Sequence, residues 1–219
     1  MEKKNRRLFL AGVSLIAAFA LWTVLVCFID VGVIGPQESS VGFSTLNGYV
    51  HNLIGVNMYL YVITDWLGLV PIGVAFDFAV LGLVQWIKRK SLLKVDRSIL
   101  ALGGFYTVVM TVYILFEIVV INYRPTLING YLEASYPSST TMLVTSVMPT
   151  AMMQLRSRIK NGLFRRCIML AIAVFIAFMV IGRLVSGVHW ITDILGGALF
   201  STGVVLIYCS LGSIVIKNG

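Results

Sequence analysis

The segment most informative about the architecture is residues 167–216, CIMLAIAVFIAFMVIGRLVSGVHWITDILGGALFSTGVVLIYCSLGSIVI. It holds two long apolar runs, 167–186 and 191–216, separated by a short break that contains His189. A helix needs about 20 apolar residues to cross the hydrocarbon core of a bilayer. The stretch therefore predicts two membrane-spanning helices joined by a short turn.

Four further apolar runs precede this pair, at residues 8–29, 66–87, 98–121 and 138–155. Only 12% of the residues are charged, against about 25% in soluble domains, and the low charge with high hydrophobicity also excludes disorder. The first run is longer than the apolar part of a signal peptide, so we expect it to stay uncleaved. We predict an all-α protein, a single membrane domain over residues 1–219 folded as a six-transmembrane-helix bundle.

The basic residues predict how the bundle is oriented. Fifteen of the seventeen lie before the first run, between runs two and three, between runs four and five, or after run six. With six spans these places fall on one side, and cytoplasmic loops carry the excess of Lys and Arg. Both termini are therefore predicted to be cytoplasmic. Because the basic clusters alternate with apolar runs and do not form one solvated face, we expect no nucleic-acid partner.

The longest connection, residues 30–65, is expected on the external side. Its mixed segment 41–63 contains several tyrosines, which favour the headgroup level of a bilayer. We interpret it as an interfacial amphipathic helix or a re-entrant piece. Near the other end of the chain, Gly197 and Ser201 form a small-xxx-small pair that predicts a close helix contact.

Residue types that bind phosphate or take part in catalysis gather at the predicted external helix ends. Arg124 and Arg183 are the two basic residues outside the cytoplasmic clusters, and guanidinium groups match phosphate oxygens in geometry. His189 and Asp193 are four residues apart and share a face if that segment is helical, an arrangement that prepares a histidine as base or nucleophile. These are components of a phosphoryl-transfer site.

A third group of polar residues opens the run at 138–155. Ser138 and Ser139 stand at a helix start, where free N–H groups and the helix dipole favour an anion. The alternative interpretation of the pair is a plain N-cap. Equally, Arg124 and Arg183 can be snorkelling anchors, and His189 with Asp193 a solvated histidine beside a helix-start carboxylate.

The order of these residues resembles the type 2 phosphatidic acid phosphatase (PAP2) superfamily of membrane lipid phosphatases. That family carries the motifs K-x6-R-P, P-S-G-H and S-R-x5-H-x3-D. The corresponding residues here are Arg124-Pro125, the segment 137–140 (PSST), and Arg183-x5-His189-x3-Asp193. The motifs lie within residues 117–193, and the six-span layout extends the resemblance to a PAP2-like core of the whole chain.

The resemblance implies roles for the matching residues. His189 would be the nucleophile that forms a phosphohistidine, and Asp193 would orient it. Arg124 and Arg183 would bind phosphate, with contacts from Ser138 and Ser139. The family uses no metal, and we expect no cofactor.

Four positions depart from the family motifs. Glu117 replaces the motif-one lysine, and we expect it to pair with and orient an arginine. Ser139 replaces the glycine of motif two, and Gly182 replaces the serine of motif three. Thr140 replaces the histidine that protonates the leaving oxygen, and a threonine hydroxyl cannot act as a general acid near neutral pH, a role worth about 10²–10⁴-fold. We hypothesise that His51 or a water supplies the proton; a diphosphate substrate would suffer less from the loss.

The predicted function is that of a PAP2-type, acid phosphatase or phosphatidic acid phosphatase-like hydrolase in phospholipid metabolism. It would act on a lipid phosphate or diphosphate through a phosphohistidine, at the external face of the cell membrane. One alternative is a degenerate, non-catalytic PAP2-like protein that binds or moves phospholipid, and another is a lipid phosphotransferase. The expected partners are a phosphorylated lipid and the bilayer; the sequence does not indicate an oligomeric state.

Overall fold

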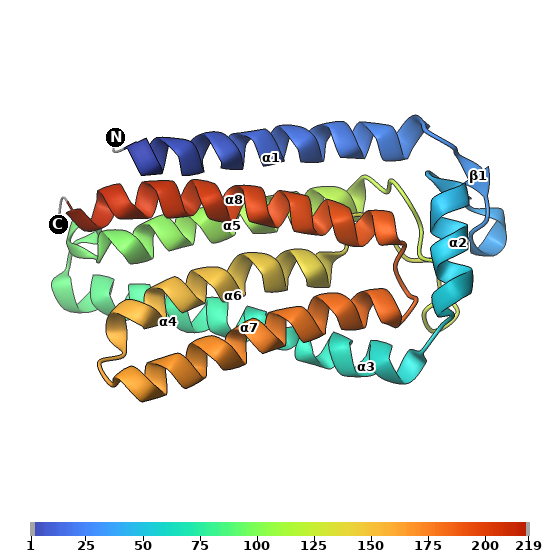
Figure 1. Cartoon of the computed structure of the whole chain (residues 1–219). Helices are drawn as coiled ribbons and strands as arrows, with labels where there is room; N and C mark the ends of the chain where they lie inside the picture. The colour runs from blue at the N-terminus through green and yellow to red at the C-terminus, as the bar shows by residue number, and fades with distance from the viewer. Residues whose placement is uncertain (1–2, 218–219) are drawn as a thin grey trace.

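The computed structural model describes the backbone of residues 3–217 and the side chains as far as residue 211. Over residues 3–217 the regular structure is α-helical apart from one short antiparallel pair, β1 (Gly32–Val33) and β2 (Ser40–Val41), and two 3-10 turns, Pro36–Glu38 and Leu92–Lys94. The helices (Figure 1) are α1 (Lys3–Phe28), α2 (Ser44–Ile54), α3 (Met58–Leu67), α4 (Leu69–Arg89), α5 (Arg97–Ile118), α6 (Ser139–Arg158), α7 (Gly162–Val185) and α8 (Ile191–Lys217).

Five segments of the described chain are long and apolar enough to cross a membrane. Three of them are the helices α1, α5 and α7. The fourth is the 32-residue stretch Met58–Arg89, which consists of α3 and α4, and the fifth is Ile191–Leu211 of α8. The predicted span 66–87 therefore begins too late, because the helical stretch starts at Met58 and passes through the junction at Gly68.

The prediction of six apolar spans is only partly supported, and the exception is α6. This helix occupies the predicted run and is 20 residues long, but it is not among the five apolar segments. Half of its residues are buried, including one serine and three threonines. Because α6 packs against α4, α5, α7 and α8, its hydroxyls face other helices, and little of its surface has to match lipid.

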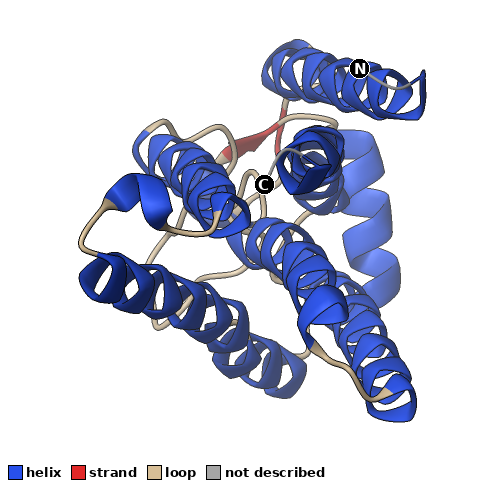
Figure 2. Cartoon of the chain, turned by 90° about the vertical axis from the view of Figure 1, so that its left-hand side faces the viewer, coloured by secondary structure: helices blue, strands red, loops and turns tan. Residues whose placement is uncertain are grey.

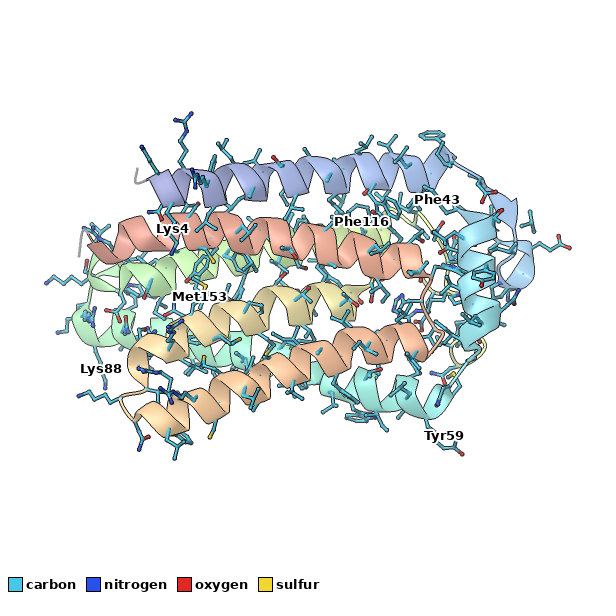
Figure 3. The ribbon with its side chains drawn as sticks, in the orientation of Figure 1. Lys4, Phe43, Tyr59, Lys88, Phe116 and Met153 are labelled. Atoms are coloured by element: carbon cyan, nitrogen blue, oxygen red, sulfur yellow. The ribbon has the colours of Figure 1, made fainter. Side chains whose placement is uncertain are left out.

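The long helices lie side by side, and the ends of α1 and α8 nearest the termini are at the same end of the bundle (Figure 1). Figure 2 views the molecule from that end, with the helices nearly end-on. Lys4 and Lys88 mark this basic end in Figure 3. The predicted clustering of basic residues at one end is therefore present in the fold; Lys217 lies outside the residues whose side chains are described.

The opposite end is closed by the long connection after α1. Helix α2 crosses the ends of the bundle helices there (Figure 1), as expected for an interfacial helix. It is fastened to the start of α8 by Asn47, whose Nδ2 donates to Thr192 Oγ1 at 3.0 Å and to the Gly42 carbonyl at 2.7 Å. Helix α3 then turns back along the bundle, so the remainder of the predicted interfacial segment belongs to a span.

Close helix contacts at small residues hold α8 in the middle of the bundle. A Cβ on Gly197 would lie 3.1 Å from the Ser138 carbonyl oxygen, and Ser201 Oγ donates to the Met142 carbonyl at 3.0 Å. The predicted small-xxx-small contact is therefore present, between α8 and the start of α6. It draws together the two helix ends that carry Ser138 and Asp193.

Candidate active site

The turn between α7 and α8 carries His189 and is shaped by Gly187. Gly187 has φ +67°, and a Cβ on it would lie 1.9 Å from the Gly55 carbonyl oxygen. A side chain at this position would meet both a backbone clash and an unfavourable φ. The turn leaves the His189 side chain buried at the closed end of the bundle.

His189 and Asp193 come together, although not as two residues on one helix face. Helix α8 begins at Ile191, after His189, and the Asp193 carboxylate folds back to accept the Trp190 N–H at 2.9 Å. His189 Nδ1 lies 3.8 Å from Asp193 Oδ2. The predicted proximity is therefore present, but the turn before the helix produces it.

A serine hydroxyl lies between the two side chains. Ser135 Oγ is 3.0 Å from His189 Nδ1 and donates to Asp193 Oδ2 at 2.5 Å. All three side chains are buried. Ser135 therefore links the imidazole to the carboxylate.

The hydrogen bonds around His189 select one tautomer. Arg183 Nη2 lies 3.3 Å from His189 Nε2, and a guanidinium only donates hydrogen bonds. Nε2 is therefore the unprotonated nitrogen, Nδ1 carries the hydrogen, and Nδ1 donates to Ser135, which in turn donates to Asp193. Burial, together with the charges of Arg124 and Arg183, holds the pKa of His189 well below its usual range. The ring is neutral at neutral pH, with its Nε2 lone pair directed toward the arginine.

Arg183 is buried at the end of α7 and lacks a full set of acceptors. Its Nη1 lies 3.4 Å from Asp65 Oδ1 and 3.5 Å from Thr64 Oγ1. Its Nε has no hydrogen-bond partner among the described residues. A buried guanidinium with a free N–H is matched by an incoming anion with several acceptor oxygens.

Arg124 reaches the same place from the loop between α5 and α6. Its backbone pairs with that of Glu133 at 3.0 Å, and its Nε lies 3.2 Å from Glu133 Oε2. That contact lacks hydrogen-bond geometry, and both Nε and Nη1 are buried without a hydrogen-bond partner in the described chain. The ring of Tyr61, on α3, faces both guanidinium groups, 5.9 Å from Arg124 Cζ and 5.1 Å from Arg183 Cζ.

The start of α6 presents backbone donors, while its N-cap hydroxyl is already used. Ser138 Oγ donates to Thr141 Oγ1 at 3.0 Å and accepts the Thr141 N–H at 3.4 Å. The Ser138 N–H donates to the Asp193 carbonyl at 3.1 Å, which fixes this helix end against α8. The groups that remain for an anion are therefore the first-turn N–H groups of Ser139 and Thr140, which have no partner within a helix.

Two predicted residues are not joined to this arrangement by a hydrogen bond or ion pair among the described residues. His51, on α2, packs its ring 5.4 Å from that of Trp190, burial lowers its pKa, and its buried Nδ1 has no hydrogen-bond partner in the described chain. The expectation that Glu117 pairs with an arginine is wrong. Glu117 is exposed at the end of α5 and forms no ion pair among the described residues. The carboxylate that lies beside Arg124 is that of Glu133, from the loop between α5 and α6.

Comparison with known proteins gives a family match that includes most of these site residues. The family model described as PAP2 superfamily matches residues 72–213. The chain belongs to the PAP2 superfamily. A solved structure titled as the first transmembrane PAP2 type phosphatidylglycerolphosphate phosphatase from Bacillus subtilis is 19% identical, with a TM-score of 0.54 over 93% of this chain and 95% of that chain. It supports the helical fold of an integral membrane protein. The comparison with curated proteins gave no match.

Several residues of this PAP2 site were not anticipated from the sequence. Ser135, Tyr61, Asp65 and Glu133 all contact a predicted site residue. Asp65 and Glu133 carried one available signal, since carboxylates are scarce in this chain and both fall on the predicted external side. Tyr61 had no distinguishing pattern, because tyrosines are frequent at membrane interfaces, and Ser135 is one of several hydroxyl residues within 135–141.

Proposed function

We propose that this PAP2 protein hydrolyses a phosphate or diphosphate monoester of a lipid through a phosphohistidine on His189. The observation that carries the proposal is the unprotonated Nε2 of His189 beside two buried arginines that retain free N–H groups. A nucleophile and donors for the phosphate oxygens thus share one buried location. Such preorganised donors stabilise the charge that develops in phosphoryl transfer.

The steps follow from the hydrogen bonds already described. Nε2 attacks phosphorus in line, the bond from phosphorus to the lipid oxygen breaks, and positive charge develops on the imidazole. The Nδ1–H, Ser135 and Asp193 chain stabilises that charge. Arg124 and Arg183 hold the equatorial oxygens, aided by the N–H groups at the start of α6. Water then attacks the phosphohistidine and releases phosphate.

The membrane setting supports a lipid as the substrate. The site lies at the end of the bundle opposite the basic clusters, so the positive-inside rule assigns it to the external face. The Bacillus subtilis structure is titled a phosphatidylglycerolphosphate phosphatase, which makes that lipid one substrate to test. The missing motif-two histidine favours a diphosphate as the second, because its leaving group needs less protonation.

The test is phosphate release in detergent by the wild-type protein and His189→Ala. The panel contains a diacylglycerol phosphate, phosphatidylglycerolphosphate and a long-chain alkyl diphosphate. We expect release by the wild type and a loss of at least about 10³-fold in the variant. With labelled substrate, an alkali-stable and acid-labile phosphoprotein should form only in the wild type. Equal rates in both proteins would contradict the proposal and leave phospholipid binding or movement without hydrolysis as the function.

A further inference from the structure

The side chain of Tyr61 lies at the site without a role in the steps above. Its ring faces the guanidinium groups of Arg124 and Arg183. The residue two positions earlier, Tyr59, is 87% exposed and points away from the bundle (Figure 3). The same helix therefore offers one tyrosine at the site and one outside it.

Helix α3 fixes Tyr61 against the arginines by its spacing. Thr64 and Asp65, three and four residues later, both contact Arg183 Nη1, and residues at these separations share a helix face. The close contact of α3 with α7 strengthens this placement, because a Cβ on Gly182 would lie 2.8 Å from Thr64 Cγ2. Tyr61 thus sits on the face of α3 that closes the site.

The phenol of Tyr61 is unengaged. Its hydroxyl forms no hydrogen bond among the described residues, and the charged groups that act on it are Asp65, Arg124, Arg183 and Glu133. The two carboxylates are already paired with the arginines. The phenol therefore keeps an O–H available, on a ring whose centre lies 5.9 Å from Arg124 Cζ and 5.1 Å from Arg183 Cζ.

The chemistry requires such a donor. When an alkoxide leaves phosphorus it needs a proton, and Thr140 stands where the family motif has a histidine. The Ser and Thr hydroxyls of the α6 start are far too weak as acids, whereas a phenol, with an ordinary pKa of about 10, protonates an alkoxide readily. His51 contacts Trp190 and lacks a described link to the arginines.

We propose that the Tyr61 phenol donates the proton to the lipid oxygen as it leaves, an inference that rests on the proposed function. The bond from His189 Nε2 to phosphorus forms while the bond from phosphorus to the lipid oxygen breaks, and its electron pair stays on oxygen. The phenolic proton moves to that oxygen and gives a lipid alcohol. Attraction to the two guanidinium groups over the ring offsets part of the cost of the resulting phenolate.

The second half of the reaction restores the phenol. Water attacks the phosphohistidine, the bond from Nε2 to phosphorus breaks, and the phenolate takes the proton that water loses. Products are the lipid alcohol and phosphate, and Tyr61 and His189 return to their starting forms. No further reactant is consumed.

The test compares leaving groups in Tyr61→Phe, which keeps the ring against the arginines and removes only the hydroxyl. The substrates are a diacylglycerol phosphate, whose alkoxide leaving group needs a proton, and 4-nitrophenyl phosphate, whose nitrophenolate leaves without one. We expect kcat to fall about 10²–10³-fold for the lipid phosphate and by less than about threefold for the nitrophenyl ester. Tyr59→Phe is the matched control, expected to behave as wild type with both.

Each other outcome has a definite meaning. Wild-type rates in Tyr61→Phe with both substrates, or an equal loss with both, overturn the inference, the latter because it marks a positioning role for the ring. A loss confined to the lipid phosphate in His51→Ala, but absent in Tyr61→Phe, assigns the proton to His51 and also overturns it. If wild type and His189→Ala hydrolyse neither substrate, the proposed function fails instead. Thermal unfolding in detergent confirms that each variant is folded.

Discussion

Two arginine–aspartate pairs lie at opposite ends of this bundle and differ in the distance between their charged groups and in the exposure of their arginines. At the basic end, Arg89 Nη1 lies 2.9 Å from Asp96 Oδ1, with the two side chains 43% and 41% exposed. At the closed end, Arg183 Nη1 lies 3.4 Å from Asp65 Oδ1, and the arginine side chain is 1% exposed. The exposed pair is the shorter one.

The distance between arginine and carboxylate therefore does not identify the pair that matters for function. Arg89 also donates to the Lys94 carbonyl and, with Asp96, closes the turn between α4 and α5; such exposed pairs contribute about 0–1 kcal/mol. Arg183 keeps a buried N–H without a partner in the described chain. Burying an incompletely paired charge costs stability, which a bound phosphate would offset.

The largest expected effect separates the two arginines by activity. Arg183→Met keeps much of the side-chain length and removes the charge, so we expect kcat/KM for the lipid phosphate to fall about 10²–10³-fold, as for loss of one donor to the transition state. Arg89→Met should leave it unchanged. Initial rates of phosphate release measure both. A comparable loss in the two variants would show that burial of Arg183 does not distinguish its role in activity from that of Arg89.

A smaller loss is expected when the link between His189 and Asp193 is cut. Ser135→Ala removes the hydroxyl that joins them, and groups that orient a functional histidine are worth about 10–100-fold. Ser157→Ala, at the far end of α6 where the hydroxyl only caps the Gln154 carbonyl, is the control. Undiminished kcat in Ser135→Ala would mean that the carboxylate acts on the imidazole directly.

Arg183→Met, the variant with the larger loss of activity, should not be the one with the larger loss of stability. Burying an incompletely paired charge costs stability, and the Asp65 carboxylate that Arg183→Met leaves unpaired is 54% exposed. Arg183→Met should therefore keep or raise the free energy of unfolding, by about 1 kcal/mol. Arg89→Met should lower it by no more than about 1 kcal/mol. Denaturation in detergent gives both values. Strong destabilisation by Arg183→Met would assign that arginine to folding.

The smallest expected change is in the pH profile. A histidine whose pKa is lowered stays unprotonated as the pH falls through its ordinary value of about 6.5, so the nucleophile is lost only at more acidic pH. We expect kcat/KM, corrected for ionisation of the substrate phosphate near pH 6, to change by less than about twofold between pH 7.5 and 6. An acid limb centred near 6.5 would show that the arginines and burial do not act on His189 as described.

Prediction from the sequence succeeded where length and hydropathy suffice. The runs at residues 98–121, 167–186 and 191–216 correspond closely to α5, α7 and α8. It was wrong about the start of the second span and about Glu117, and it assigned no role to Asp65, the last residue of the predicted connection 30–65. Those errors share a cause: pairing between α3, α7 and the loop that carries Glu133 depends on which helices are neighbours, which no local pattern states.

Length, hydropathy and charge pattern were enough to predict a helical membrane protein and to single out four residues, Arg124, Arg183, His189 and Asp193. They were enough because the bilayer imposes a length on apolar segments and makes isolated charges conspicuous. The three-dimensional packing was needed to show that Ser135 links His189 to Asp193 and that the Tyr61 ring faces both arginines. These contacts join residues from different helices and loops, so they arise from packing.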